Sequence, residues 1–508
     1  MFYPSPEEFI KLTKKGNLIP VYKEVLGDLE TPVSAHLKMA ANAKYSFLLE
    51  SVEGEEKVAR FSFLSKNPEL VFQVKGRHAK ITRFQNGQAT QNDFEIAKPF
   101  LSYIREIMSA YQFVSVKGLP RFCGGLVGYF GYDVVRFFEE LPKKPADDLN
   151  LPDTILVLAK NLVIFDRVNH KIKVVSCASV RAGAGQNEKI QAYKAAASEI
   201  EAMIQELQKP LVSETSPTPR ALSAAAATPL IRSNFSQAQF ERIVAKAKKF
   251  IQKGDIIQVV LSQRFETKLG VSPFSIYRVL RSLNPSPYMF YLHFNSTHLI
   301  GSSPELLVRC ENGIVETRPI AGTRRRGKNE KEDSALSKNL LSDPKELAEH
   351  TMLVDLGRND LGRVCKKGSV KLSEFMAIEK YSHVMHIVSN VKGALRKDKD
   401  IFDVLEAAFP AGTVSGAPKI RAMEIIDELE NVSRGPYAGC VGYFSFSGNL
   451  DTCITIRTIV AANGTAYIQA GAGIVADSNP RKEFTETLNK AKAQIMAIEI
   501  AQKQNTKR

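Results

Sequence analysis

A stretch with almost no large apolar residues interrupts the chain between residues 209 and 234. From residue 210 it reads PLVSETSPTPRALSAAAATPLIRSN, and this Ser, Pro, Ala and Thr content is typical of a linker. A chain of 508 residues is also too long for one ordinary core. We therefore expect an N-terminal segment from 1 to 208, a linker from 209 to 234, and a larger segment from 235 to 508.

Hydrophobic periodicity predicts strands and helices on both sides of the linker. The run DTILVLAKNLVIFD, from Asp153, indicates two strands, and a helical pattern extends from about Glu188 to Lys209. After the linker, FSQAQFERIVAKAKKFIQKGD indicates a helix that ends at Gly254, and IIQVVLSQRFE indicates a strand.

The composition excludes several classes of protein. Hydrophobic residues make up 44% and charged residues 24% of the chain, as in folded globular proteins. No apolar run is long enough to span a bilayer, and the polar N-terminus is unlike a secretory signal, so we expect a cytoplasmic protein that binds no membrane. The six cysteines have no metal or redox spacing, which predicts buried free thiols.

A net charge of +15 invites a nucleic-acid function, but the basic residues are dispersed. Their sharpest cluster, TRRRGK from Thr323, is predicted to be a short basic loop. We expect no nucleic-acid partner.

Two predicted helices begin with a proline and carry paired acids. In DPKELAEHTMLVDL, Asp343 is the expected N-cap, and Glu346, placed to close a capping box, is followed by Glu349. In NPRKEFTETLNKAKAQ, Glu483 and Glu486 follow Pro480. The four carboxylates suit one Mg²⁺ ion, which prefers oxygen ligands. The alternative explanation is that Glu346 is only a capping-box acid and Glu483 an exposed first-turn acid stabilised by the helix dipole, and spacing alone favours this alternative.

Seven strings occur in order along the second segment: RPIAGTRRRG, DPKELAEHTMLVDLGRNDLGRVC, YSHVMHIVSNVKG, GTVSGAPKIRAMEII, RGPYAGCVGYF, DTCITIRT and QAGAGIVADSNPRKEFTETLNKA. Together they resemble the chorismate-utilising enzymes, and among these the component I group of anthranilate synthases. The resemblance implies an α+β fold with a large antiparallel β-sandwich flanked by helices. It also implies a lyase of tryptophan biosynthesis that converts chorismate and ammonia to anthranilate and pyruvate.

The resemblance also implies roles for individual residues. Catalytic roles fall on His386, which assists pyruvate elimination, on Glu305, which protonates the departing 4-hydroxyl, and on Thr413. Mg²⁺ is implied as cofactor, held directly by Glu349 and Glu486 and through water by Glu346 and Glu483. The implied substrate-binding residues are Gly322, Thr323, Tyr437, Arg457, Gly471, Ala472, Gly473 and Lys490, with Arg457 as a fork for a carboxylate and the Gly-Ala-Gly run as a source of backbone N–H groups.

Two positions distinguish the possible activities. Relatives that add water carry a lysine where this chain has Gln258, and aminodeoxychorismate synthases carry a nucleophilic lysine where it has Ala321. External ammonia is then the expected nucleophile. An aminodeoxychorismate synthase component I is the alternative enzyme, and a non-catalytic tryptophan-sensing protein is the alternative of a different class.

A partner and a regulator are expected as well. No Gly-x-Cys-x-Gly nucleophile elbow with a downstream histidine is present, so ammonia must come from a separate glutamine amidotransferase subunit, in a heterotetramer of two large and two small subunits. Two stretches, LLES and NPSPYMF, resemble the tryptophan site of feedback-inhibited members. Glu50 or Ser51 is expected to meet the ammonium group, with Pro287, Tyr288 and Met289 around the indole.

Overall fold

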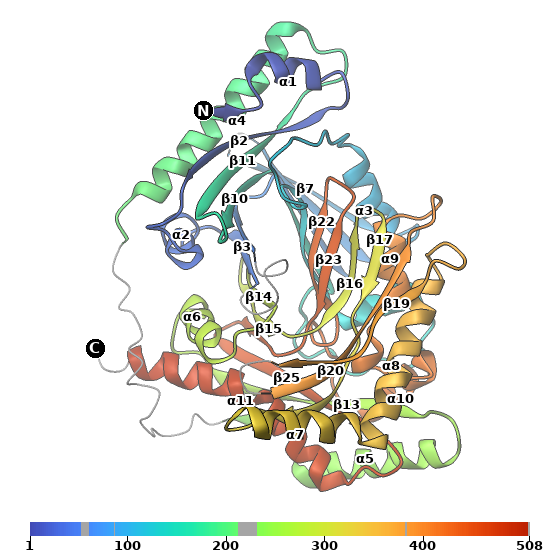
Figure 1. The fold of residues 1–508 in the computed structure, drawn as a ribbon. Helices are drawn as coiled ribbons and strands as arrows, with labels where there is room; N and C mark the ends of the chain where they lie inside the picture. The colour runs from blue at the N-terminus through green and yellow to red at the C-terminus, as the bar shows by residue number, and fades with distance from the viewer. Residues whose placement is uncertain (52–59, 86, 212–230, 381–383, 506–508) are drawn as a thin grey trace.

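The structure, a computed structural model, describes residues 1–51, 60–85, 87–211, 231–380 and 384–505. Most of the predicted linker therefore lies outside the described residues. What the structure does describe is the relation between the segments on either side of it, which contribute to the same two β-sheets (Figure 1).

The first sheet has thirteen strands, all paired antiparallel. In spatial order they are β1 (Phe2–Tyr3), β2 (Leu18–Leu26), β11 (Lys171–Ser179), β10 (Asn161–Asp166), β4 (Phe61–Lys66), β3 (Tyr45–Glu50), β14 (Tyr288–Phe294), β15 (Thr297–Ser303), β24 (Thr458–Ala462), β25 (Thr465–Ile474), β13 (Gln258–Lys268) and β12 (Arg232–Ser233), with β21 (Gly416–Ala417) beside β13.

The second sheet has twelve strands. In spatial order they are β18 (Ile320–Arg325), β20 (Val384–Ala394), β17 (Ile314–Thr317), β16 (Leu306–Glu311), β23 (Leu450–Ile454), β22 (Cys440–Ser445), β8 (Gly125–Phe130), β9 (Thr154–Ala159), β5 (Leu70–Lys75), β6 (His78–Gln85) and β7 (Gln88–Glu95), with β19 (Lys371–Lys380) beside β20.

Each sheet is joined at its middle by one pairing between the two segments. In the first sheet β3 pairs with β14, which sets Glu50 opposite Met289. In the second sheet β8 pairs with β22, which sets Phe130 opposite Cys440. The backbone hydrogen bonds of both sheets therefore continue across the predicted boundary between the segments.

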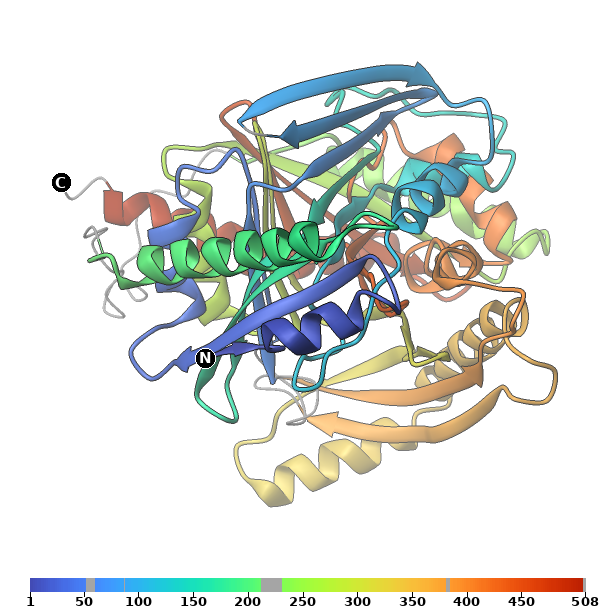
Figure 2. The same cartoon turned by 90° about the horizontal axis from the view of Figure 1, so that it is seen from above.

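Helices cover the outer faces of the sheets, as Figure 1 shows for α4 on the N-terminal strands and α11 below β25. They are α1 (Pro6–Leu12), α2 (Pro32–Met39), α3 (Phe100–Ser109), α4 (Gln186–Gln208), α5 (Gln237–Gln252), α6 (Pro273–Leu283), α7 (Glu330–Leu341), α8 (Pro344–Gly362), α9 (Ile401–Ala408), α10 (Lys419–Leu429) and α11 (Pro480–Asn505), with short 3₁₀ turns η1 (Tyr132–Phe137) and η3 (Gly412–Val414). Figure 2 shows the yellow and orange segment of α7, α8, β19 and β20 at one side of the molecule.

The core has three large parts. One cluster fills the space between the sheets and includes Phe47, Tyr129, Phe290 and Tyr443. The other two clusters lie where helices pack on the sheets, and one of them includes residues of both sheets. The predicted α+β fold, a large antiparallel β-sandwich flanked by helices, is confirmed.

Most local predictions are also confirmed. The run from Asp153 forms β9 and β10, but these consecutive strands belong to different sheets. The predicted helices match α4 and α5, and Gly254 follows α5 with a φ of +81°. Among the described residues, no helix is long and apolar enough to cross a membrane.

One buried histidine predicts how stability depends on pH. His36, on α2, is 2% exposed, and its ring stacks on Phe274 with 4.0 Å between ring centroids. Neither ring nitrogen has a hydrogen-bond partner among the described residues, and burial lowers the pKa of His36 to about 3. An unfolded histidine has a pKa of about 6.5, so the unfolded state binds a proton first as the pH falls.

The His36 contribution to the free energy of unfolding should therefore be lost between pH 6.5 and about 3, by up to about 1.4 kcal/mol per pH unit. His36→Phe, which keeps the aromatic stack, should remove this part of the slope. Urea unfolding at several pH values measures it. The same slope in both proteins would contradict the assignment.

Candidate active site

A cavity of about 410 Å³ opens between the first sheet, β18 and β20 of the second sheet, and helices α8 and α11. Almost all of the predicted catalytic, substrate-binding and metal-binding residues line it. These are Glu305, His386, Thr413, Gly322, Thr323, Tyr437, Arg457, Gly471, Gly473, Lys490, Glu346, Glu349 and Glu486. These residues come from β18, α8, β20, η3, β25 and α11 and from three loops, so segments far apart in the sequence meet at one site.

Two of the predicted residues do not line this cavity. Ala472 lies between Gly471 and Gly473 on β25, and because side chains alternate along a strand, its methyl group points into the core and is fully buried. Glu483 lies in the first turn of α11. Its negative charge still raises the pKa of Glu349, so it lies within electrostatic reach of the cavity.

The two proline-initiated helices form as the sequence indicates. The Asp343 side chain accepts hydrogen bonds from the amides of Lys345 and Glu346 at 3.0 and 3.4 Å, and the Asn479 side chain accepts one from the Lys482 amide at 3.1 Å. The expected capping box at Glu346 is not formed. Its carboxylate accepts a hydrogen bond from Arg324 Nη1 at 3.0 Å instead.

The acidic side chains at the cavity repel one another and are partly neutralised. The pKa of Glu349 is raised, first by burial and then by the charge of Glu346. Lys490 Nζ lies 3.4 Å from Glu486 Oε1. Within the described residues, no three or more His, Cys, Asp or Glu side chains are grouped closely enough to hold a metal ion. Arg324 and Lys490 supply the positive charge in this arrangement.

Half of the predicted basic loop is the end of a strand, and its arginines are ion-paired. Thr323 to Arg325 belong to β18. Arg324 pairs with Asp343 and Glu346, Arg325 with Glu332, and Arg326 with Asp333. These acids come from the starts of α7 and α8, so the cluster offers little unbalanced charge to a polyanion.

A β-bulge in β18 places His386 at the cavity wall. The pairing of β18 with β20 shifts between Ala321 and Thr323, and Gly322 has a φ of +69°, a conformation that glycine adopts without strain. His386 Nδ1 lies 2.9 Å from the Gly322 carbonyl oxygen and 3.1 Å from Thr323 Oγ1. Because a carbonyl can only accept, Nδ1 carries the proton and Nε2 the lone pair.

Electrostatics keep His386 neutral. Burial lowers its pKa and the charge of Arg457 lowers it further, whereas the Gly322 carbonyl and Glu346 act in the opposite direction. A neutral imidazole with Nδ1 protonated is the form in which Nε2 can act as a base.

The pKa of Glu305 is shifted in the opposite direction to that of His386. Burial raises its pKa to about 7, an effect that Thr413 and Lys490 partly offset. Thr413 faces the carboxyl group, but its hydroxyl makes no hydrogen bond of ordinary geometry among the described residues. Near neutral pH a large fraction of Glu305 is therefore protonated, as a general acid must be.

The cationic wall is held in a fixed shape. Arg457 has a φ of +51°, an uncommon conformation for a residue with a side chain. Its guanidinium donates to the Lys490 carbonyl, and its own carbonyl accepts from Gln494 Nε2 at 3.1 Å. Lys490 Nζ in turn donates to the Gly471 carbonyl at 3.1 Å.

Gly471 leaves room for a tyrosine hydroxyl. A Cβ atom at this position would lie 2.7 Å from Tyr437 Oη, which is too close for two non-bonded atoms. Burial raises the pKa of Tyr437 to about 12, so this hydroxyl remains a hydrogen-bond donor at the cavity.

The structure adds Gln494 and Gln258 to the residues that line the cavity. The sequence analysis used Gln258 only to distinguish this chain from relatives that add water. Both side chains line the cavity, and the Oε1 atoms of both are buried without a partner among the described residues. A bound ligand would satisfy such atoms. Gln494 could have been found from spacing, since it follows Glu486 and Lys490 at helical intervals of four.

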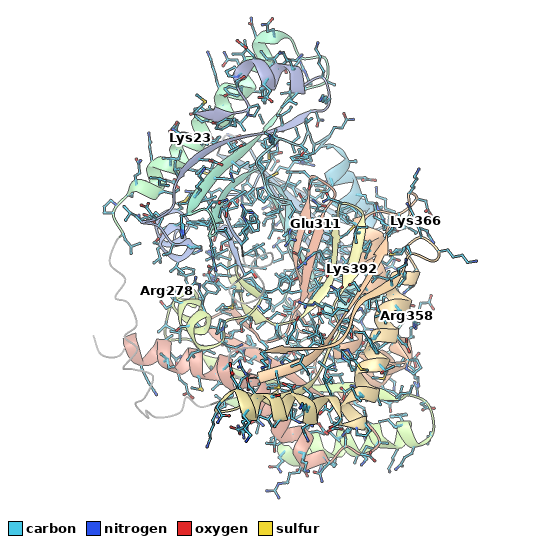
Figure 3. All side chains as sticks on the ribbon, in the orientation of Figure 1. Lys23, Arg278, Glu311, Arg358, Lys366 and Lys392 are labelled. Carbon is cyan, nitrogen blue, oxygen red and sulfur yellow. The ribbon has the colours of Figure 1, made fainter. Side chains whose placement is uncertain are left out.

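A second, larger cavity of about 660 Å³ lies between the two sheets. All five residues predicted to bind tryptophan line it: Glu50, Ser51, Pro287, Tyr288 and Met289. Aromatic side chains surround one part of it, and charged side chains line another, including Glu311 and Lys392, which Figure 3 labels beside the strands of the second sheet.

The structure distinguishes the two candidates for an ammonium contact in this cavity. Glu50 already accepts hydrogen bonds from Tyr277 at 2.6 Å, from Arg167 at 2.6 Å, and from Arg281 at 2.9 and 3.1 Å. Ser51 Oγ is buried with no partner among the described residues. The Ser51 hydroxyl is therefore the group with unused hydrogen-bonding capacity.

Pro304 and Ile320 line both cavities. Their neighbours in sequence, Glu305 and Ala321 respectively, line the smaller cavity but not the larger one. The two cavities therefore adjoin through a shared wall.

Comparison with known proteins gives a consistent result. Residues 46–496 match the family described as chorismate binding enzyme. The chain is 50% identical over 501 residues to anthranilate synthase component 1 of Acetivibrio thermocellus, covering 99% of each chain. It is 51% identical over 498 residues to that of Aquifex aeolicus, covering 98% of each.

Solved structures agree. Anthranilate synthase component I from Streptococcus pneumoniae superposes with a TM-score of 0.73 at 38% identity, covering 93% of this chain and 99% of that one. The menaquinone-specific isochorismate synthase from Escherichia coli superposes with a TM-score of 0.67 at 19% identity, covering 97% and 98%. This second likeness concerns the fold alone.

The bulge at Gly322 predicts a measurable cost of substitution. In Gly322→Ala the new Cβ would lie 3.0 Å from Leu340 Cδ1 and 3.1 Å from Glu346 Oε2. The left-handed backbone alone should cost about 1 kcal/mol, and crowding should raise the loss to about 2 kcal/mol.

Gly313→Ala is the matched control, because Gly313 has a φ of +76° with no atom within 4 Å of an added Cβ. Urea unfolding should show the larger loss for Gly322→Ala. Equal losses would show that the crowding is relieved without cost.

Proposed function

The chain belongs to the chorismate binding enzyme family, and on this premise we propose that it is the lyase component of an anthranilate synthase in tryptophan biosynthesis. It would convert chorismate and ammonia to anthranilate and pyruvate. The observation that carries the proposal is the pairing of a protonatable Glu305 with a neutral His386 in one cavity walled by cationic side chains.

The choice of ammonia as nucleophile rests on two uncharged side chains. Gln258 and Ala321 both line the cavity. In the resembling enzymes that add water, a lysine occupies the position of Gln258. In those that use their own amine, a lysine occupies the position of Ala321. Neither position offers an amine here, so the nucleophile has to come from outside the chain. This also disfavours an aminodeoxychorismate synthase.

Chorismate is a dianion, and the cavity offers donors for both of its carboxylates. Arg457 presents a guanidinium fork, and Tyr437 contributes a hydroxyl donor. Lys490 supplies further positive charge. The cationic wall would hold the substrate in one orientation, so that ring carbons 2 and 4 meet the nucleophile and the acid.

Glu305 and His386 would then act in turn. With its raised pKa, Glu305 can give a proton to the 4-hydroxyl as that group leaves and ammonia adds at carbon 2. The lone pair of His386 Nε2 can assist removal of the ring proton as pyruvate is eliminated and the ring becomes aromatic. Thr413 lies beside Glu305 and has an unused hydroxyl for the substrate.

Mg²⁺ is part of the proposal as cofactor. Glu349 and Glu486 would bind it directly, with Glu346 and Glu483 acting through water. The donor atoms suit a hard cation, because they are all oxygens. Burial, and after it the charge of Glu346, raises the pKa of Glu349, and a bound cation would favour its charged form. Bound Mg²⁺ would neutralise and orient the ring carboxylate.

Incubated with chorismate, Mg²⁺ and ammonium, the purified chain should release anthranilate and pyruvate in equal amounts. Glutamine in place of ammonium should give no product. Glu349→Gln should lower turnover at least 100-fold, because it removes a charged ligand of the metal while leaving the fold intact. Anthranilate fluorescence and circular dichroism measure the two properties.

Glu499→Gln, on α11 outside the cavity, is the control and should keep wild-type turnover. Absence of anthranilate from the wild-type chain, or formation of isochorismate instead, would overturn the proposed function. Normal activity of Glu349→Gln in excess chelator would overturn the metal assignment alone.

A glutamine amidotransferase partner is also proposed, in a heterotetramer of two large and two small subunits. All six cysteines are buried and free. Burial raises the pKa of Cys440, the cysteine nearest to a nucleophile motif, well above its usual range, so a thiolate there is disfavoured. A separate subunit that produces ammonia is consistent with these cysteines, and a cytoplasmic location is consistent with the substrates.

Feedback inhibition by L-tryptophan is proposed for the cavity between the sheets. Its aromatic part suits an indole ring, and Ser51 Oγ has unused capacity for the ammonium group. The shared wall at Pro304 and Ile320 gives a route by which occupancy of one cavity could bias the other. Chorismate and tryptophan should then weaken each other's binding.

Ser51→Ala should raise the tryptophan concentration needed for half-inhibition by about tenfold, the value of one hydrogen bond to a charged group. Turnover without tryptophan should not change. Ser46→Ala is the control, since Ser46 Oγ is also buried and unpartnered among the described residues but does not line the cavity.

Binding can be followed separately by indole fluorescence, because the chain contains no tryptophan. Saturating L-tryptophan that alters neither this signal nor the rate would show that no regulatory site exists.

A further inference from the structure

An arginine–glutamate pair lies buried behind the catalytic cavity. Arg434 is 3% exposed and Glu430 is 5% exposed. Arg434 Nε and Nη2 donate to the two carboxylate oxygens of Glu430 at 2.9 and 2.7 Å. Neither residue lines the cavity, so neither can touch a substrate there.

The pair makes four further hydrogen bonds, three to β13 and one to η3. Arg434 Nη1 donates to the Val414 carbonyl at 2.7 Å, and Nη2 donates to the Val260 carbonyl at 2.7 Å. Glu430 Oε1 accepts from the backbone amide and the hydroxyl of Ser262 at 2.7 and 2.8 Å.

These contacts end on the walls of the cavity. Val260 and Val414 both line it, and Val414 follows Thr413, which faces the acid Glu305. The Ser262 hydroxyl accepts from Gln469 Nε2 at 2.9 Å, and Gln469 also lines the cavity. One buried pair thus connects three wall segments: β13, η3 and β25.

A fourth wall segment rests on the same guanidinium. Arg434 Cζ lies 5.6 Å from the centre of the Tyr437 ring and 4.7 Å from that of Tyr132. The Tyr437 amide also donates to the Arg434 carbonyl at 3.2 Å. The orientation of Tyr437 toward Gly471 and the cavity therefore depends on where Arg434 lies.

Stability does not explain why an ion pair occupies this place. Removing two charges from water costs about as much free energy as their attraction returns, so apolar residues would often serve equally well. What the pair provides is a rigid fork of donors and acceptors that fixes several segments at once.

We infer that Arg434 and Glu430 are positioning residues for catalysis, which hold Thr413, Tyr437 and the β13 wall around the reacting substrate. The inference rests on the proposed function, because it assigns the pair a part in chorismate turnover. A displacement of about 1 Å at a reacting group can cost about 100-fold in rate, which sets the scale of the expected effect.

Arg434→Lys is the test variant, because it keeps the charge but cannot reach Glu430 and both carbonyls together. We expect kcat to fall about 10- to 100-fold while KM for chorismate changes less than about threefold, because Arg457 and Lys490 still hold the carboxylates. Hydrogen–deuterium exchange should rise in residues 411–417, which include Thr413 and Val414. Glu430→Asp, with its shorter reach, should produce the same pattern in a milder form.

Arg136→Lys is the matched control. Arg136 is also largely buried and pairs with Asp427 on α10 at 2.6 Å, three residues before Glu430, but its bonds lead to η1 and the loop that follows it. The Arg136→Lys variant should lower the melting temperature by about as much as Arg434→Lys and leave kcat near the wild-type value. If Arg434→Lys fails to melt cooperatively, Glu430→Asp is compared with Arg136→Lys instead.

Equal kcat values for the test and control variants, or unchanged exchange in 411–417, would overturn the inference. The inference would also be overturned if, across these variants, kcat fell only in proportion to the fall in melting temperature. A wild-type chain that makes no anthranilate would overturn the proposed function, whereas the exchange comparison would still decide whether the pair holds the cavity wall.

Discussion

Strand pairing between the two halves of the chain is the constraint on which both cavities depend. The β3–β14 ladder brings Ser51 and Glu50 to Tyr288 and Met289, and without it the larger cavity would lack one wall. The β8–β22 ladder completes the second sheet, on which β16, β18 and β20 are carried. Because one residue of slippage along a strand reverses the direction of every side chain, the register of these ladders determines which side chains reach the cavities.

Charge balance decides what the smaller cavity can do. Acids from α8 and α11 lie close to cations from β18, α11 and the turn at Arg457. Burial in the same cavity shifts the pKa values of Glu305 and His386 in opposite directions. The pKa of Glu305 rises while that of His386 falls, so one cavity holds an acid and a base near neutral pH. Behind the wall, Glu430 and Arg434 form an ion pair with 2.7 Å between Arg434 Nη2 and Glu430 Oε1. Backbone geometry contributes to this electrostatic arrangement, because the bulge at Gly322 positions His386 and the turn at Arg457 positions its guanidinium.

Much of this could be predicted from local patterns. The helix starts at Pro344 and Pro480 follow from capping chemistry, and the strands near Asp153 follow from apolar runs. The resemblance of ordered motifs identified most residues of the smaller cavity and all five predicted residues of the larger one. Other features escaped this approach. Glu346 meets Arg324 rather than its own helix start, and Ala472 turns into the core, because both outcomes depend on neighbours that are distant in sequence. Half of the predicted basic loop is strand, and acids from α7 and α8 neutralise its arginines.

By itself the sequence determined which elements form and which residue types are available, since capping, periodicity and turn chemistry act over a few residues. It also determined that no amine stands at positions 258 and 321, which bears on the nucleophile. Only the tertiary structure decided that consecutive strands β9 and β10 enter different sheets, and that Ser51 rather than Glu50 keeps unused hydrogen-bonding capacity. It also decided that Arg434 and Glu430 together join four wall segments of one cavity. These outcomes depend on burial and on hydrogen bonds between residues far apart in the chain, which exist only once the two sheets have packed face to face.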